Sequence, residues 1–234
     1  MRAAPFIGLL RLDTHFPRPV GDIGNPNSFD FPVRTVVVRG ATARAAVQGD
    51  PGALLAPFVR AARRQVDAGA VAIATSCGFL TPLQRALAQA VPVPVATSAL
   101  LQVAWLAPML GSGRRVGVLT IDADALGAPH LEAVGAPADT PVIGLPRSGA
   151  LAGAIFGDRD RLDRSRARDE VLAAGRRLVS RHPTVDAIVL ECTNLPPYRT
   201  ALAQALRLPV FDANTLLVFL WMATGHPLRS DTAR

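Results

Sequence analysis

The sequence predicts an α/β protein made of two pseudo-symmetric domains, each with a parallel β-sheet, and a cleft between them. Short apolar runs of strand length alternate with stretches of helical spacing along the chain. The second half repeats the pattern of the first, and each half carries one of the two cysteines. The 234 residues are half hydrophobic, which is enough for one large domain or two small ones.

The internal repeat is the strongest of these observations. When the chain is shifted by 115 residues, 14 of the 37 positions in 70–106 match identical residues in 185–221. Both cysteines fall in register, and so do two pairs of prolines. A shift of 109 residues aligns the first strands, 7–13 and 116–122. Two similar halves are therefore expected, each contributing one cysteine.

The elements follow in the same order in both halves. We expect strands at 6–12, 35–38, 71–75 and 93–96, and again at 115–121, 187–190 and 208–211. Helices are expected at 54–68, 82–90 and 100–110, and again at 197–206 and 216–222. Residues 144–158 are interpreted as an irregular loop. We assign 1–97 and 212–234 to the first domain and 98–211 to the second.

Both cysteines directly follow a predicted strand. Ligands bind at the carboxyl ends of strands in open parallel sheets, so Cys77 and Cys192 are the candidate catalytic residues. A helix begins shortly after each, and the positive end of its dipole is expected to lower the thiol pKa. Neighbouring donors suited to an anion are expected to bind substrate, and Gly78 allows close approach of the backbone. These candidates are Thr75, Ser76, Gly78, Thr193 and Asn194. The alternative is that Cys77 and Cys192 are inert buried cysteines.

The composition excludes several classes of chemistry. All 25 basic residues are arginine, so pyridoxal-phosphate enzymes, lysine aldolases and Walker A phosphate loops are excluded. The two cysteines and four histidines lack metal-ligand spacing. We therefore expect no pyridoxal phosphate and no metal.

The charge and the chain ends carry less information. The formal net charge is +7, but the eight arginines in 159–181 are mixed with acidic residues, which is typical of a solvated helical face. We expect no nucleic-acid partner. No stretch is typical of a signal peptide or a membrane span, so we expect a soluble cytoplasmic protein with no membrane partner.

Two thiols that face each other across a cleft suit one reaction especially well. One thiolate removes a proton from the carbon next to a carboxylate, and the other thiol returns a proton to the opposite face. The stereocentre is inverted without a cofactor. Donors in the cleft stabilise the enolate-like charge that develops.

The paired cysteine motifs, Thr75-Ser76-Cys77-Gly78-Phe79 and Glu191-Cys192-Thr193-Asn194-Leu195, resemble those of the aspartate/glutamate racemase superfamily. That superfamily includes hydantoin racemase, maleate cis-trans isomerase and arylmalonate decarboxylase. The resemblance implies an active site at the interface of two α/β domains, no metal or cofactor, Cys77 and Cys192 as the acid/base pair, and a possible homodimer.

The motifs depart from those of the superfamily's amino-acid racemases. These racemases usually have Cys-Asn-Thr at the first site, where this chain has Gly78 and Phe79 after the cysteine. Asn194 stands where His or Glu usually follows Cys-Thr. Decarboxylases of the superfamily keep only the second cysteine, so the presence of both favours a racemase or isomerase.

Loops after the first strand of each half are also expected to line the cleft. They supply Arg11 and Asp13 in one half and Thr120 in the other as substrate-binding candidates. Arg11 could clamp a carboxylate or pair with Asp13, and Asp13 could equally be an ordinary turn residue. Residues 17–32, rich in Pro, Gly and Asn, are interpreted as a connecting loop or a lid.

The sequence thus favours a cofactor-independent racemase or epimerase that acts at the carbon next to the carboxylate of a small substrate. The alternatives are a malonate-type decarboxylase, a maleate-type cis-trans isomerase with Cys77 as nucleophile, and a non-catalytic carboxylate-binding protein.

Overall fold

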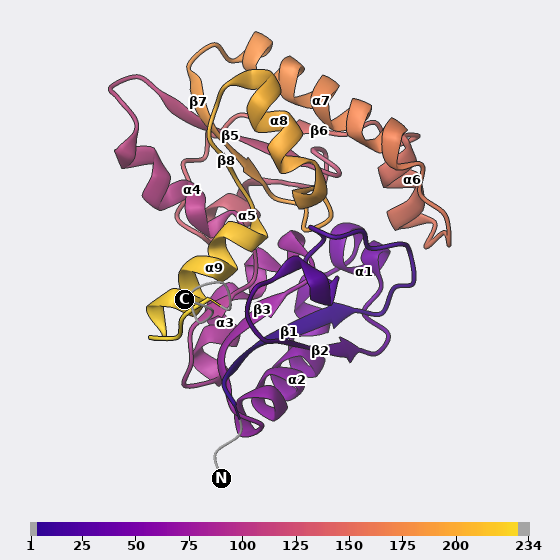
Figure 1. Cartoon of the computed structure of the whole chain (residues 1–234), viewed down its shortest axis with the longest axis vertical. Helices are drawn as coiled ribbons and strands as arrows, with labels where there is room; N and C mark the ends of the chain where they lie inside the picture. Colours follow the sequence, from indigo (N-terminus) through magenta and orange to yellow (C-terminus); the bar gives the residue numbers. More distant parts are fainter. Residues whose placement is uncertain (1–3, 229–234) are drawn as a thin grey trace.

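The structure is a computed structural model that describes residues 4–228. It contains two four-stranded parallel sheets, one in each half of the chain, with helices around them (Figure 1). The predicted two-domain α/β fold is therefore confirmed.

The two sheets have the same topology. The first has the order β2-β1-β3-β4 and the second β6-β5-β7-β8. The strands of the first sheet are β1 (Phe6–Leu12), β2 (Val33–Val38), β3 (Ala70–Thr75) and β4 (Val95–Ala96). Those of the second are β5 (Arg115–Thr120), β6 (Val142–Gly144), β7 (Val185–Leu190) and β8 (Val210–Phe211). Even the irregularity near the start of the pairing between β1 and β3 recurs between β5 and β7.

Helices connect the strands of each half. In the first half they are α1 (Ala43–Gln48), α2 (Leu55–Asp67), α3 (Gln84–Ala90) and α4 (Leu101–Leu106). Those of the second are α5 (Ala128–Glu132), α6 (Ala150–Phe156), α7 (Arg164–Arg181), α8 (Arg199–Leu206) and α9 (Ala213–Ala223). A short 3-10 helix precedes α3 at Gly78–Leu83 and another precedes α8 at Pro196–Tyr198. The segments that follow the two cysteines are thus alike in shape.

The central strands are buried on both faces because helices cover both sides of each sheet. Ile7, Leu9 and Leu10 of β1 are fully buried, as are Ile188 and Val189 of β7. The last helix, α9, returns to the first sheet, where Leu217 and Trp221 join the hydrophobic cluster that contains Ile7 and Leu9 (Figure 1). Helix α9 therefore ties the two halves together.

The prediction of an irregular loop at 144–158 is wrong. Residues 150–156 form α6, whose start is capped by the Glu170 carboxylate, which accepts a hydrogen bond of 2.8 Å from the Ala150 N–H. The cap comes from α7, far along the chain, so local composition does not reveal it. The short strand β6 was also not predicted.

Residues 13–32 form a packed wall of the molecule. Asp22, Ile23 and Phe31 are at most 2% exposed. The wall is fastened to the second half, because the Asp158 carboxylate accepts hydrogen bonds from the backbone N–H groups of His15 and Phe16. This segment therefore closes one side of the space between the domains.

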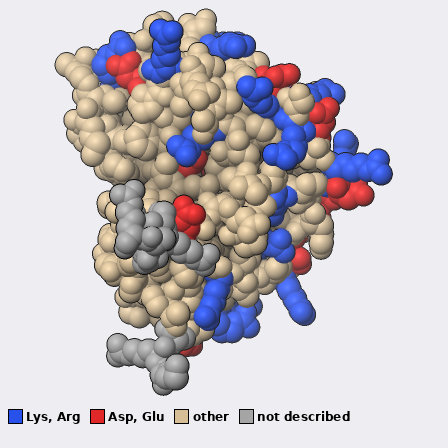
Figure 2. Space-filling view, viewed as in Figure 1, with Lys and Arg blue, Asp and Glu red and all other residues tan. Residues whose placement is uncertain are grey.

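The surface bears basic and acidic groups together. Figure 2 shows arginines spread over the viewed face with acidic side chains beside many of them. Within residues 4–228 no helix combines the length and the apolar character needed to cross a membrane.

Replacement of Gly21 tests the packing of this wall. Gly21 has a φ of +100°, and a Cβ there would lie 2.8 Å from Pro197 Cα in the second half. We expect Gly21→Ala to lower the free energy of unfolding by about 2 kcal/mol or more, since backbone strain and a backbone clash add. Chemical denaturation measures this change.

Gly40 supplies the matched control. Its φ is +78°, but nothing lies within 4 Å of the Cβ position. Gly40→Ala should cost about 1 kcal/mol, from conformation alone. Equal effects of the two substitutions would show that the wall does not press against the second half.

Candidate active site

A cavity lies where the carboxyl ends of β3 and β7 face each other. Its boundary contains residues of both halves and of the wall at residues 13–32. The lining residues are Leu12, Phe16, Arg18, Ala43, Val47, Ser76, Cys77, Gly78, Phe79, Ile121, Ile155, Glu191, Cys192, Thr193 and Asn194. The cavity is narrow, because the space that the centre of a water-sized sphere can reach in it is about 20 Å³. Both cysteines therefore border one cavity, contributed by matching positions of the repeat.

Hydrogen bonds hold the two site loops together across the domain boundary. The Thr193 hydroxyl donates to the Ser76 carbonyl oxygen over 2.7 Å, and both residues are buried. The Ser76 hydroxyl in turn accepts from the Leu12 N–H over 2.9 Å. The first bond joins the loops that carry the two cysteines, and the second anchors Ser76 to the end of β1.

The Cys77 thiol is held in its protonated form. Burial raises the pKa of Cys77 to about 12, and the nearby Glu191 carboxyl adds to the increase. A hydrogen bond from the Phe79 N–H acts in the opposite direction and is outweighed. The expectation that a helix start lowers the thiol pKa is therefore wrong, because desolvation dominates.

Cys192 has a similar environment. Burial raises its pKa well above the ordinary value, with a further contribution from Glu191, while the Asn194 N–H favours the thiolate. The Cys192 thiol donates to Asn194 Oδ1 at 3.5 Å. Each sulfur thus has a backbone N–H two residues further on that can stabilise its charge when the thiolate forms.

A polar chain fixes Asn194 behind Cys192. Asn194 Nδ2 donates to Asp22 over 2.6 Å, and Arg18 donates to the other oxygen of Asp22 over 2.9 Å. The side chains of Arg18 and Asp22 are 8% and 1% exposed. Asp22 and Arg18 come from the wall at residues 13–32, so this segment orients a residue of the second-half motif.

Glu191 lies fully buried at the end of β7, next to Cys192. Thr120 donates to its Oε2 over 2.6 Å, and its buried Oε1 has no hydrogen-bond partner among the described residues. Burial raises the pKa of Glu191 to about 8, although the bond from Thr120 lowers it. A carboxyl group that can gain or lose a proton near neutral pH thus stands beside both thiols.

The structure brings most of the predicted residues together but leaves four outside the cavity lining. Thr75 donates to backbone oxygens, and Thr120 supports Glu191. Asp13 accepts from the Gly40 N–H in a turn. Burial and the neighbouring Arg18 lower the pKa of Arg11, which is not among the lining residues.

Sequence reasoning missed nine lining residues, because their positions depend on tertiary structure. Five of them are aliphatic, and the four that bring aromatic or charged groups are Phe16, Arg18, Phe79 and Glu191. The position of Glu191 directly before Cys192 was the available signal. Phe16 and Arg18 stand before the Pro/Gly/Asn-rich stretch, and no local pattern directs them into the cleft.

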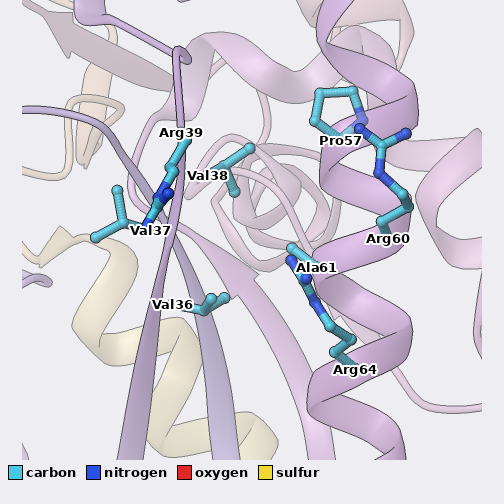
Figure 3. A pocket seen from close by; sticks show the side chains of 8 residues that line it. All are labelled: Val36, Val37, Val38, Arg39, Pro57, Arg60, Ala61 and Arg64. Carbon is cyan, nitrogen blue, oxygen red and sulfur yellow. The ribbon is translucent and has the colours of Figure 1, made fainter.

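A second, more open hollow lies away from the thiols. It lies between β2 and α2 and is bordered by the arginines Arg39, Arg60 and Arg64 (Figure 3). Figure 3 shows Arg60 and Arg64 projecting from α2, with Arg39 at the end of β2. This hollow contains neither nucleophile nor carboxylate, so the thiol-lined cavity is the candidate active site.

Comparison with curated sequences finds proteins named as lyases. The chain is 34% identical over 97% of its length to dimethylsulfoniopropionate lyase 5 of Emiliania huxleyi. It is 26% identical over 88% of its length to dimethylsulfoniopropionate lyase of Durusdinium sp. clade D. The chain spans only 47% of the length of the first relative and 71% of the second. No family model matches the chain.

Comparison with solved structures finds the same fold. A variant of arylmalonate decarboxylase in a sulfate-associated form has a TM-score of 0.60, with 21% identity over 88% of this chain and 87% of that one. Allantoin racemase from Klebsiella pneumoniae has a TM-score of 0.59, with 16% identity over 96% and 90% of the two chains. Aspartate racemase of Picrophilus torridus has 0.56, with 14% identity over 97% of both. The fold expected from the resemblance is confirmed.

The buried Glu191 makes stability depend on pH. The folded protein keeps the Glu191 proton up to about pH 8, whereas an unfolded chain loses it near the ordinary value of 4.5. The unfolded state then binds fewer protons, so stability falls as pH rises between these values. We expect Glu191→Gln to remove on the order of 3 kcal/mol of this fall.

Denaturation of both proteins at several pH values between about 5 and 8.5 measures the effect. As pH rises, the unfolding free energy of the wild type should fall relative to that of Glu191→Gln. A gap that is the same at every pH would contradict the burial of an ionisable Glu191.

Proposed function

We propose that this chain, which has the fold shared by arylmalonate decarboxylase, allantoin racemase and aspartate racemase, is a cysteine-dependent lyase. Its substrate class is a propionate with a leaving group on the β carbon, and dimethylsulfoniopropionate is the expected member. The observation that carries the proposal is the pair of buried thiols, Cys77 and Cys192, on one cavity. The 34% identity to a protein named dimethylsulfoniopropionate lyase supports the choice of substrate.

The reaction needs a base at the carbon next to the carboxylate. A cysteine thiolate removes one proton from this α carbon, and the electron pair of the C–H bond forms the double bond to the β carbon. The bond between the β carbon and the sulfonium sulfur breaks, and its electron pair leaves with dimethyl sulfide. The products are acrylate, dimethyl sulfide and a protonated cysteine, which later releases its proton.

The raised thiol pKa fits a charged substrate. Both thiols hold their protons because burial disfavours the thiolate. A sulfonium cation bound in the same cavity favours thiolate formation, since opposite charges attract strongly at low dielectric constant. The base is thus activated by the substrate that it attacks.

The substrate carboxylate needs a positive partner in the cavity. Among the described lining residues Arg18 is the one basic side chain. It lies over the Phe16 ring at 4.4 Å and pairs with Asp22, which holds its guanidinium in place. We assign carboxylate recognition to Arg18, because a fixed guanidinium binds carboxylates well.

Racemisation or epimerisation is the second candidate. The presence of a thiol from each half favours it, because proton removal on one face and delivery on the other need two groups. Both reactions share the first step, removal of the α proton of a carboxylate by cysteine. They differ in the second step, since elimination expels the β substituent and needs only one base, whereas inversion needs a proton from a second group.

The location of the enzyme follows from the same chemistry. A reaction that uses free thiols requires that they stay reduced, so we propose that the chain works in the cytoplasm.

Product analysis tests the function. The protein is incubated with dimethylsulfoniopropionate, dimethyl sulfide is measured in the headspace, and acrylate is followed by NMR. We expect both products in equal amounts. At least one of Cys77→Ala and Cys192→Ala should slow their release by about 100-fold or more, the usual effect of losing a general base.

Ser180→Ala, which removes an exposed hydroxyl on α7, is the control and should leave the rate unchanged. Full activity in both cysteine variants would refute thiol catalysis. Absence of dimethyl sulfide, together with α-deuterium incorporation into a chiral carboxylic acid in D2O that requires both cysteines, would favour the racemase.

A further inference from the structure

One oxygen of the Glu191 carboxyl is buried and unpartnered at the cavity that the two cysteines line. Its Oε2 is satisfied by Thr120, whereas its Oε1 has no hydrogen-bond partner among the described residues. The side chain is fully buried, so surrounding solvent does not compensate the free oxygen. A buried carboxylate oxygen without a partner is costly, so this oxygen would be stabilised by a positively charged ligand group in the cavity.

Gly78 makes room for this carboxyl. A Cβ at position 78 would lie 2.1 Å from Glu191 Oε1 and 2.5 Å from the Glu191 carbonyl oxygen. Any other residue at 78 would therefore push the carboxyl aside or separate the two site loops. Gly78 of the first half and Glu191 of the second form one unit across the domain boundary.

The other groups around the cavity do not neutralise Glu191. Arg18 donates to Asp22 and Thr14, and not to Glu191. Phe79 contributes a second aromatic side chain to the lining besides Phe16, whose ring is covered by Arg18, and aromatic rings attract methylated cations. A negative group beside an aromatic ring suits a cation that has methyl groups instead of N–H donors.

We propose that Glu191, in the space left by Gly78, binds the positively charged group on the substrate's β carbon and selects onium compounds over neutral ones. This inference rests on the proposed function for the class of substrate, a β-substituted propionate. It adds a residue that determines specificity at the cationic end of the substrate, opposite the end that carries the carboxylate. Glu191 thereby also holds the cation near the thiols, and the positive charge of the cation favours the thiolate.

Binding of two matched probes tests the assignment without turnover. The cationic probe is 3-(trimethylammonio)propionate, and the neutral probe is its carbon isostere 4,4-dimethylpentanoate. Calorimetry at about pH 8.5 gives a Kd for each. The readout is the ratio of the two Kd values, because shape and carboxylate contacts cancel in it.

The ratio should shift toward the neutral probe by about 10-fold or more in Glu191→Gln, the usual effect of removing a charged partner. Gly78→Ala should shift it in the same direction, because the added methyl group displaces Oε1. Glu132→Gln, which changes an exposed glutamate, is the control and should keep the wild-type ratio. Glu191→Gln keeps the shape of the side chain, so the test does not depend on how well Gly78→Ala folds.

An unchanged ratio in Glu191→Gln would overturn the inference, and so would failure of the wild type to bind either probe. The outcome is separate from that of the proposed function. A chain whose ratio depends on Glu191 but which releases no dimethyl sulfide refutes the lyase and supports the cation site. If the wild type releases dimethyl sulfide but has the same ratio of Kd values as Glu191→Gln, the lyase is supported and the cation site is refuted.

Discussion

The direct contact between the two cysteine-bearing loops is the constraint on which the rest of the site depends. The Thr193 hydroxyl bonds to the Ser76 carbonyl oxygen across the domain boundary, and Gly78 packs against the Glu191 carboxyl. Both loops follow the third strand of a sheet with the same order, so the repeat brings their ends to one place. A site shared by two halves arises because neither loop can complete the cavity alone.

Burial determines the protonation state of the ionisable groups in this site. Removal from water holds Cys77, Cys192 and Glu191 protonated more strongly than in solution, and each ionised group would oppose the next. A neutral ligand would leave all three groups protonated and the thiols inactive as bases. A substrate with a fixed positive charge reverses the balance, because it stabilises both a carboxylate and a thiolate. Substrate recognition and base activation are then the same electrostatic event.

The sequence predicted the elements that depend on local pattern. Strand β1 was placed at its observed ends, and the register of the repeat placed both cysteines at equivalent strand ends. Helix α6 was missed because its cap is supplied by Glu170 of another helix. The thiol pKa was expected to fall, since the sequence shows a helix start but not the depth of burial.

The binding residues also divide into those that local pattern predicts and those that depend on tertiary structure. Asp13 and Arg11 were inferred from their position after a strand, yet they lie outside the lining, because the wall at residues 13–32 brings Arg18 there instead. Gly78 was noted as a departure from a racemase motif. The structure gives that departure a physical reason, because the Glu191 carboxyl occupies the space that a side chain at position 78 would fill. Pairs of residues 113 positions apart in the chain are not visible to local pattern.

A structure with a bound ligand tests the central claim most directly. The protein would be crystallised with 3-(trimethylammonio)propionate, whose amine leaves poorly. The account predicts that the α carbon lies against a cysteine sulfur in the cavity, with the carboxylate at Arg18 and the methylated nitrogen beside Glu191. A ligand with its charged ends reversed, or one bound outside the cavity shared by Cys77 and Cys192, would contradict it.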